Sequence, residues 1–447
     1  MLKLNRIKLS TLQIIALGFI IIILVGAGLL SLPFASVDGG VSFIDALFTA
    51  TSATCVTGLV VMDTATEWTL FGQIVILVMI QIGGLGFMTF AILFLRMFRK
   101  RFGLKNKEVM VESINASNLD RIVSITNKML IGTLVFELGG ALLLSIRFVP
   151  QFGWGQGLWY GLFHSVSAFC NAGFDLMGVQ TPFISLVNYA DDVLVNVVIM
   201  LLITIGGIGF LVWDDITKFG LKLKRYSLTS KIVLAFSAIL IFGGALLMYL
   251  SEYAGKESDL TFGQQLLRAL FASVTARTAG FNTIDLSQMS DGGRLVSMVL
   301  MFIGGSPGST AGGIKTTTFA VIFIYTFAGV SHKQSADVFG RRIPEGAFKR
   351  AVYVFFTNIL LVVTGTFIIS CLNPDIRFSA VLFECFSAIG TVGLTVGITT
   401  QLDLVSHIVL ILLMYLGRVG SISFATVLFE KRARPAVVNP KERITIG

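Results

Sequence analysis

The stretch Ser52-Ala-Thr-Cys-Val-Thr-Gly58 joins two apolar segments and ends in a glycine, and three other loops of the chain repeat this arrangement. They read Ser167-Ala-Phe-Cys-Asn-Ala-Gly173, Thr275-Ala-Arg-Thr-Ala-Gly280 and Ser387-Ala-Ile-Gly-Thr-Val-Gly393. Their last glycines are separated by 115, 107 and 113 positions, and the third loop is one residue shorter than the others. One structural unit repeated four times can close a ring, and a ring of loops can surround an ion.

The composition indicates a chain that is solvated mostly by lipid. Its mean hydropathy is +0.85 and only 13% of its residues are charged, whereas about a quarter are charged in a soluble globular chain. Apolar runs of about 20 residues can cross a hydrocarbon core roughly 30 Å thick. They predict eight spanning segments, near residues 11–32, 70–95, 126–148, 193–213, 231–251, 294–325, 350–371 and 404–429. The first run is too long for the apolar region of a secretory signal, so we interpret it as an uncleaved helix.

The positive charge follows the expected membrane topology. The net charge is +9, and 26 of the 34 Lys and Arg residues precede the first predicted span or follow an even-numbered one. This is the positive-inside pattern of a multi-pass cell-membrane protein whose N- and C-termini are both cytoplasmic. The basic excess therefore reflects topology and contact with membrane lipid, and it does not indicate a nucleic-acid partner.

The sequence contains no motif for nucleotide or metal chemistry. No G-x-G-x-x-G follows a predicted strand and no P-loop lysine motif occurs, and the four cysteines show no C-x-x-C pair and no metal-binding spacing. We therefore expect no enzyme activity and no ATP site, so transport energy must come from an ion gradient, the membrane potential or a partner. Cys55 and Cys170 occupy matching loop positions, which favours packing beneath the loops over a disulfide.

Each glycine loop follows a segment that is too short to span the membrane. These half-crossings cover Phe43–Ala53, Leu158–Ala168, Phe262–Ala276 and Ser379–Ala388, and each contains a Leu-Phe pair. The predicted fold is all-α and integral to the membrane. It has four tandem M1-P-M2 units (outer helix, re-entrant pore helix and loop, inner helix) in a pseudo-fourfold arrangement around one pore, with eight transmembrane helices. The units cover residues 1–103, 104–225 with a cytoplasmic linker, 226–345 with a broken inner helix, and 346–447 with a short tail.

Irregular backbone at membrane depth is tolerated only where protein or a water-filled cavity satisfies its polar groups. We therefore expect the four loops to face inward, with the pore helices aiming their C-terminal ends, where the helix dipole favours cations, at the centre. Rings of backbone carbonyls can replace the hydration shell of potassium, and Thr391-Val392-Gly393 is a literal T-V-G filter sequence. The candidate filter residues are Thr54, Cys55, Val56, Thr57, Gly58, Cys170, Asn171, Ala172, Gly173, Thr278, Ala279, Gly280, Gly390, Thr391, Val392 and Gly393.

The sixth predicted span is interrupted by ten residues that cannot hold a regular helix. They are Gly304, Gly305, Ser306, Pro307, Gly308, Ser309, Thr310, Ala311, Gly312 and Gly313. Arg418 lies inside the eighth predicted span, where a buried charge is costly and is either functional or paired. We interpret Arg418 as a barrier to cations below the filter and the insert beside it as a gate; a purely structural pairing of Arg418 is the alternative.

Other charged residues near the loops have structural or electrostatic interpretations. We expect Arg277 to point away from the filter and to pair with an acid such as Asp285 or Asp291. We expect Lys315 to extend to the membrane interface. Acids on the non-basic side either concentrate cations near the mouth of the pore or form a merely solvated rim; they are Asp45, Asp63, Asp175, Asp285 and Asp403.

The four loops, the insert at 304–313 and Arg418 resemble the Trk/Ktr/HKT superfamily of potassium transporters, and Arg277-Thr-Ala-Gly-Phe-Asn282 with the short tails is most similar to its Ktr membrane subunit, KtrB. The resemblance covers essentially the whole chain. It implies transport of K⁺, often dependent on Na⁺, in a homodimer with one pore per subunit. It implies filter glycines at Gly58, Gly173, Gly280 and Gly393, a gating loop at Gly304–Gly313, and a pore arginine at Arg418. The implied partner is a cytoplasmic octameric regulatory ring of the KtrA type, which binds ATP or ADP.

The sequence thus predicts potassium uptake through a channel-like subunit. A secondary transporter of ammonium or a small organic solute that works by alternating access is the alternative, and four parallel units favour the pore over it. A membrane scaffold without transport explains neither the repeated glycines nor the interrupted sixth span.

Overall fold

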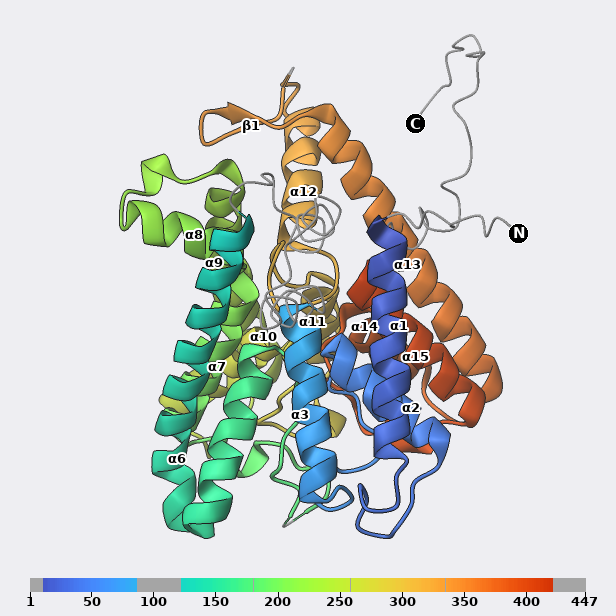
Figure 1. Ribbon diagram of the computed structural model, residues 1–447. Coiled ribbons are helices and arrows are strands. Elements are labelled where there is room, and N and C mark those ends of the chain that lie inside the picture. The colour runs from blue at the N-terminus through green and yellow to red at the C-terminus, as the bar shows by residue number, and fades with distance from the viewer. Residues whose placement is uncertain (1–10, 87–121, 180, 258, 334, 421–447) are drawn as a thin grey trace, which may run out of the picture.

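The structure is a computed structural model that describes residues 11–86 and 122–420, apart from Gln180, Ser258 and Gln334. Nearly all of its regular structure is helical (Figure 1), as the sequence predicts. The α-helices are α1 (Thr11–Leu30), α2 (Phe43–Cys55), α3 (Leu70–Leu85), α6 (Ile122–Phe169), α7 (Val193–Ile208), α8 (Phe210–Phe219), α9 (Leu228–Glu252), α10 (Phe262–Thr275), α11 (Asp291–Phe302), α12 (Thr316–Val330), α13 (Glu345–Leu372), α14 (Phe378–Gly390) and α15 (Leu404–Val419). Short 3-10 helices cover Val187–Tyr189, Leu223–Arg225, Leu286–Gln288 and Thr399–Gln401. The strands β1 (Asp337–Val338) and β2 (Arg341–Arg342) form one small antiparallel hairpin.

Several helices of the described chain are suited to a bilayer. Four of them, α1, α6, α9 and α13, are long and apolar enough to cross a membrane, and the bent pair α7–α8 makes a fifth if it counts as one span. The helices α3 and α15 end at Leu85 and Val419. The later parts of the predicted spans 70–95 and 404–429 lie outside the described residues. The predicted total of eight spans therefore stays a prediction.

The outer surface of the helices carries large apolar side chains. Leu142, Phe242 and Phe367 on three of the long helices are 68%, 68% and 69% exposed. A soluble protein rarely exposes contiguous apolar surface of this kind, whereas lipid covers it without cost. The structure thus agrees with the hydropathy in describing a multi-pass membrane protein.

Helix α6 contains both an outer helix and a half-crossing. Pro150 lacks the N–H that would continue the helical ladder, and Gly153 has a non-helical φ of 81° and ψ of 170°. Figure 1 shows the two arms of α6 lying side by side, and a Cβ atom on Gly161 of the second arm would lie 2.8 Å from Ala141 O of the first. The kink therefore separates the predicted span 126–148 from the predicted half-crossing 158–168.

Four short helical segments precede the glycine loops: α2, the second arm of α6, α10 and α14. The phenylalanine of each repeated Leu-Phe pair is fully enclosed, since Phe48, Phe163, Phe271 and Phe383 are 0–1% exposed. Burying an aromatic ring contributes about 2–3 kcal/mol. The repeated pair thus anchors each half-crossing in the protein core and fixes where its loop begins.

Two inner helices are broken near the level of the loops. The helix α11 ends at Phe302 and α12 begins at Thr316, so the interruption predicted over 304–313 is present. The span predicted near 193–213 covers α7 and a sharp bend that the sequence did not predict, because α7 and α8 meet at an angle of 92°. Gly209 at the bend has φ 100° and ψ 140°, a conformation that glycine adopts readily and that ends the helical ladder.

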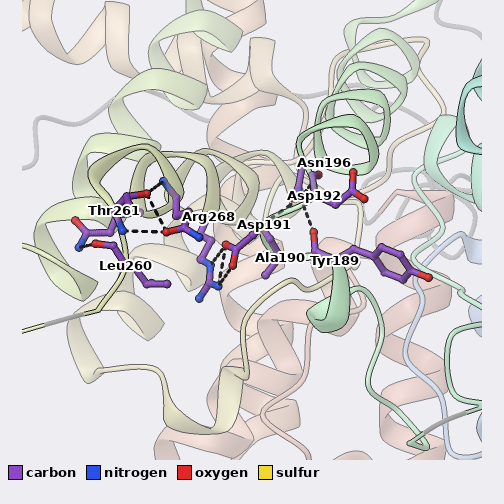
Figure 2. A network of polar contacts seen from close by, with 10 residues as sticks. Tyr189, Ala190, Asp191, Asp192, Asn196, Leu260, Thr261 and Arg268 are labelled. Carbon is purple, nitrogen blue, oxygen red and sulfur yellow. Dashed lines mark hydrogen bonds and ion pairs between the residues drawn. The ribbon is translucent and has the colours of Figure 1, made fainter. Parts of the chain in front are cut away.

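A polar network ties the segment before α7 to α10 (Figure 2). Arg268 on α10 donates to both carboxylate oxygens of Asp191, at 2.9 and 3.0 Å. Asn196 on α7 donates its side-chain amide to Tyr189 O at 2.7 Å and to Asp192 O at 2.8 Å. The two-point geometry of the guanidinium–carboxylate pair fixes the orientation of both side chains, and the pair thereby joins the segment before α7 to the third half-crossing, which is distant in sequence.

The Arg268–Asp191 pair gives a stability prediction. Because both side chains are partly exposed, at 20% and 44%, a double-mutant cycle of Arg268→Ala and Asp191→Ala should give a coupling of about 0.5–1 kcal/mol in thermal unfolding of the purified protein. The Lys256–Glu252 pair, with its atoms 3.7 Å apart at the C-terminal end of α9, serves as the matched control and should couple less. Equal coupling in the two cycles would contradict the importance of the two-point geometry.

Candidate functional site

Four glycines form the centre of the candidate site. Gly58, Gly173, Gly280 and Gly393 have φ values of 91°, 71°, 87° and 92°. This left-handed region is open to glycine and strained for residues with a side chain. The residues two positions earlier, Val56, Asn171, Thr278 and Thr391, also have positive φ, between 49° and 77°. The four loops therefore share one backbone turn, although the third is one residue shorter.

Each glycine lies against the main-chain oxygen of the neighbouring loop. If a ring glycine carried a Cβ atom, that atom would lie within 2.6 Å of a main-chain oxygen of another loop. The four pairs are Gly58 with Ala172 O, Gly173 with Ala279 O, Gly280 with Val392 O, and Gly393 with Thr57 O. The contacts run from the first loop to the second, third and fourth and back to the first, so the loops form a closed ring. A side chain at any of the four positions would collide with backbone.

The first residue of each loop stabilises the ring from behind. Ser52 Oγ accepts a hydrogen bond from Gly58 N at 3.0 Å, and Ser387 Oγ accepts one from Gly393 N at 3.0 Å. In the other two loops, Ser167 and Thr275 donate to the carbonyl of the residue after the glycine. The sequence analysis did not include these residues in the site, although their matching positions at the start of every quoted loop could have revealed them.

A cavity of about 150 Å³ adjoins the ring on one side. Besides the four glycines, its lining includes Asp63 and Asp175. Asp63 is fixed by N–H donors of Ala65 at 2.9 Å and Phe183 at 2.7 Å. Burial, with a smaller contribution from the nearby Asp63, raises the pKa of Asp175 to about 7. The mouth of the ring therefore carries one fixed carboxylate and one that titrates near neutral pH.

The other predicted mouth acids have local structural roles. Asp45 accepts a hydrogen bond from Ser42 at the start of α2, Asp285 caps a 3-10 helix through Ser287 N, and Asp403 caps α15 through Ser406 N. Such capping interactions stabilise helix N-termini. The five predicted acids thus divide into two that line the cavity, two that cap helices, and Asp45 in the first turn of α2 beside its cap Ser42.

The insert 304–313 forms an ordered loop against α7 and α8. Ser306 N donates to Gly207 O at 3.0 Å, Thr310 N donates to Gly206 O at 3.3 Å, and Phe210 N donates to Gly308 O at 2.7 Å. Backbone groups freed by the bend at Gly209 and those of the insert therefore satisfy each other. This pairing is what allows two stretches of irregular backbone to exist inside the protein.

The insert also contacts the glycine loops directly. Asn171 Nδ2 donates to Thr310 Oγ1 at 2.9 Å, and Thr310 Oγ1 donates to Phe169 O at 3.0 Å. A Cβ atom on Gly312 would collide with Thr391 Oγ1. The insert therefore lies against the second and fourth loops, on residues that the sequence assigns to the filter.

Arg418 on α15 is surrounded by backbone carbonyls. Its guanidinium donates to Thr310 O of the insert and to Gly83 O and Gly84 O at the end of α3, the last at 3.2 Å. No ion pair of Arg418 occurs within residues 11–86 and 122–420. The positive charge of Arg418 is therefore stabilised by the dipoles of backbone carbonyls. The hydrogen bonds of its guanidinium join the insert to α3 and α15.

Two expectations for charged residues are wrong. Arg277 does not pair with Asp285 or Asp291: its guanidinium donates to Ser237 Oγ and Thr316 Oγ1, both at 3.3 Å, because α9 and the start of α12 lie behind the third loop. Asp291 instead approaches Arg294 at 3.9 Å. Lys315 does not extend to an interface but donates to Ala311 O of the insert at 2.8 Å.

The remaining filter candidates form the buried base of the loops. Thr54, Cys55, Cys170 and Gly390 are buried or tightly enclosed, and both cysteines are free thiols. A Cβ atom on Gly83 of α3 would collide with Thr54 O, and one on Gly206 of α7 with Phe169 O. The glycines of the inner helices thus permit close packing beneath the loops.

Comparisons with known proteins agree with this architecture. Residues 27–435 match the family described as "TrkH: Cation transport protein". The chain is 42% identical over 454 residues to "Potassium/sodium uptake protein NtpJ" of Enterococcus hirae, covering 100% of this chain and 99% of that protein. It is 41% identical to "Ktr system potassium uptake protein B" of Bacillus subtilis, covering 92% of this chain and 91% of the relative.

A solved structure shows the same fold. The potassium transporter TrkH from Vibrio parahaemolyticus superposes with a TM-score of 0.73 at 17% sequence identity, over 96% of this chain and 86% of that one. The family match extends over most of the chain, including every glycine loop, the insert and Arg418. The chain therefore belongs to the TrkH family of cation transport proteins, which are membrane transporters and not enzymes.

Proposed function

We propose that this chain takes up potassium ions across the cell membrane, through a pore whose selectivity filter is the ring at Gly58, Gly173, Gly280 and Gly393. The main support for the proposal is the closed ring of contacts in which each glycine lies against a main-chain oxygen of the next loop. Main-chain oxygens can replace the water that K⁺ loses on entering a narrow pore. The names of the two relatives, which describe potassium uptake proteins, support potassium as the transported ion.

The fourfold organisation belongs to this proposal. The half-crossing α2 packs against α1 and α3, and α14 packs against α13 and α15. In the third unit α10 packs against α9 and α11, and in the second the half-crossing and outer helix are both parts of α6, which packs against α7. These contacts support four M1-P-M2 units with eight transmembrane helices around one pore, and they favour a pore over alternating access.

Replacing a ring glycine tests the filter assignment. Gly393→Ala should lower K⁺ uptake at least about tenfold, because the added Cβ would collide with Thr57 O and because a left-handed φ strains alanine. The matched control is Gly39→Ala, since Gly39 has a similar φ of 78° and no atom within 4 Å of an added Cβ. Uptake is measured as rescue of a K⁺-uptake-deficient cell at low K⁺. Equal growth of the two variants at equal membrane levels would show that the ring does not conduct.

The insert 304–313, with Arg418, is the proposed gate of this pore. It lies against the second and fourth loops through Thr310 and Gly312, and the guanidinium of Arg418 donates to Thr310 O. A positive charge close to the path repels cations, and the insert occludes the space beside it. Displacing the insert requires these hydrogen bonds to break, so they hold the closed state.

Thr310 gives the sharpest test of the gate. Thr310→Val removes two side-chain hydrogen bonds of about 1 kcal/mol each, so the ratio of open to closed pores should rise about 5- to 30-fold and basal K⁺ flux into proteoliposomes should increase. Thr310→Ser keeps the hydroxyl and should behave as the wild type, and deletion of 304–313 should raise flux further. A correctly folded deletion with unchanged or lower flux would exclude the insert as the main obstruction.

Na⁺, nucleotide and partner proteins complete the proposal. The name of one relative contains sodium as well as potassium, which supports Na⁺ as an activating or coupling ion. A homodimer with one pore per subunit, and a cytoplasmic octameric ring of the KtrA type that binds ATP or ADP, follow from the resemblance to Ktr systems. Both chain termini are proposed to be cytoplasmic, from the distribution of Lys and Arg.

The acids that line the cavity are proposed to concentrate cations at the mouth of the filter. Asp63 and Asp175 both face the cavity beside the ring, and negative charge in a confined space raises the local cation concentration. Because the pKa of Asp175 is raised to about 7, its carboxyl is neutral at acidic pH and becomes charged as pH rises through 7. Ion capture at low K⁺ should therefore increase with pH.

The pH dependence of uptake tests this role of Asp175. Initial K⁺ uptake at sub-saturating K⁺ should rise about two- to fivefold between pH 6 and pH 8, and Asp175→Asn should flatten this rise by holding uptake at its low-pH level. Asp45→Asn is the control, because Asp45 lies in the first turn of α2, outside the cavity lining. A steep rise that persists in Asp175→Asn would contradict the assignment.

A further inference from the structure

The bend between α7 and α8 borders an apolar cavity that shares no lining residue with the cavity beside the ring. The cavity measures about 300 Å³ and lies between α6, α7 and α8. Its walls include Met129, Phe136, Ile205, Phe210 and Trp213. An apolar cavity half this size already excludes water and binds small apolar molecules. The ligand that fits it is therefore a hydrocarbon chain and not a polar solute.

The cavity wall is rigid and has its polar groups satisfied. The ring of Trp213 packs at 5.2 Å against both Phe136 and Phe210. Its indole N–H donates to Ile205 O at 3.2 Å, a carbonyl near the end of α7. Because the N–H of Trp213 already has an acceptor, this side chain presents only its apolar ring surface to the cavity. The sharp turn of α8 away from α7, visible at the upper left of Figure 1, keeps the cavity open.

The rim of the cavity carries closely paired charges. Lys128 Nζ approaches Asp214 at 2.9 Å, and Lys218 pairs with the same carboxylate. The two lysine side chains are 44% and 34% exposed. The neighbouring acid, Asp215, accepts a hydrogen bond from Ser230 Oγ at 2.7 Å and is a second carboxylate, so two lysines face two acids here. The excess of positive charge comes from the segment that follows α8.

The segment that follows α8 supplies this positive charge. Lys222, Lys224 and Arg225 are exposed and form no ion pair in the part of the chain that the structure describes. Leu221 and Leu223 alternate with them and are 97% and 58% exposed. Basic residues interleaved with exposed leucines are typical of a surface that lies in the interfacial layer of an anionic membrane.

From this juxtaposition we propose that the cavity and its basic rim form a binding site for one anionic phospholipid. An acyl chain fills the cavity between α6, α7 and α8, and the phosphate is held by Lys128, Lys218 and the basic residues of 222–225. The excess basic charge of residues 222–225 selects an anionic headgroup over a zwitterionic one, since the ammonium group of a zwitterionic headgroup offsets the charge of its phosphate, whereas an anionic headgroup keeps that negative charge. Neither the filter nor the gate is part of this site.

A lipid bound at this site would also affect how the insert is anchored. The helix α8 begins at Phe210, whose N–H donates to Gly308 O of the insert at 2.7 Å, and Phe210 also lines the cavity. An acyl chain in the cavity therefore packs against the residue that anchors the insert. Loss of the lipid should loosen α8 and with it this anchor.

Lipid retention by the purified full-length chain tests the proposal. Wild-type protein is delipidated in detergent and titrated with phosphatidylglycerol, with phosphatidylcholine of the same acyl chains, and with glycerol phosphate, and bound molecules are counted by native mass spectrometry. Phosphatidylglycerol should bind at one site, at least about tenfold more tightly than either other probe. Equal binding of the two phospholipids, or tight binding of glycerol phosphate alone, would overturn the proposal.

Two sets of variants separate this site from general surface charge. Lys222→Gln, Lys224→Gln and Arg225→Gln together should weaken phosphatidylglycerol binding about tenfold. The matched control removes three charges elsewhere, at Lys333, Arg341 and Arg342 by the β1–β2 hairpin, and should leave binding unchanged. Equal losses in both triple variants would mean that only net charge matters, which contradicts a defined site.

Filling the cavity tests the acyl chain. Ile216→Trp places a large ring at the cavity wall and should reduce retention of phosphatidylglycerol, whereas Ile216→Ala should preserve it. A photoactivatable phosphatidylglycerol should label α6 and α8 in the wild type, which needs no variant to fold. Labelling elsewhere, or cross-linking of these helices to residues 87–95 of the same chain in place of lipid, would show that the cavity has another occupant.

Discussion

The contact between each ring glycine and the main-chain oxygen of the next loop is the constraint on which the structure depends. Four left-handed glycines leave no room for a side chain, and this lets four loops approach one another until their carbonyls meet. Each loop is held from behind by a serine or threonine hydroxyl. A buried phenylalanine of the preceding half-crossing anchors each loop in the protein core. The ring is therefore assembled from local interactions that the sequence repeats four times.

The second constraint is the satisfaction of irregular backbone inside the bilayer. The insert 304–313 and the bend at Gly209 would each leave polar groups unpaired if they occurred alone, at a cost of several kcal/mol per group in lipid. Together they exchange hydrogen bonds, and Arg418 donates to carbonyls that remain. The pairing explains why the breaks in α7 and between α11 and α12 lie side by side.

The sequence predicted the repeated parts of this architecture well. The spacing of the glycine loops located the four half-crossings, and the run Gly304–Gly313 located a broken helix, because glycine, proline and serine cannot sustain a helical ladder. The bend at Gly209 was missed, since Ile205-Gly-Gly-Ile-Gly-Phe210 has the same pattern as the packing glycines of Ile82-Gly-Gly-Leu-Gly-Phe87. The neighbouring insert, far away in sequence, supplies backbone hydrogen bonds that stabilise the break. The predicted partner of Arg277 and the predicted interfacial position of Lys315 were wrong for the same reason: the groups that these two residues contact are hydroxyl and main-chain groups brought near by packing, which no charge pattern reveals.

The account is tested most directly by locating the ion. A crystallographic map of the purified protein with rubidium or thallium in place of potassium would show anomalous density from a bound monovalent cation. The account predicts a peak on the axis of the ring, at coordination distance from the carbonyl oxygens of Thr57, Ala172, Ala279 and Val392. Density confined to the lipid-facing surface or the cavity near α8, with none among these four oxygens at saturating ion, would contradict it.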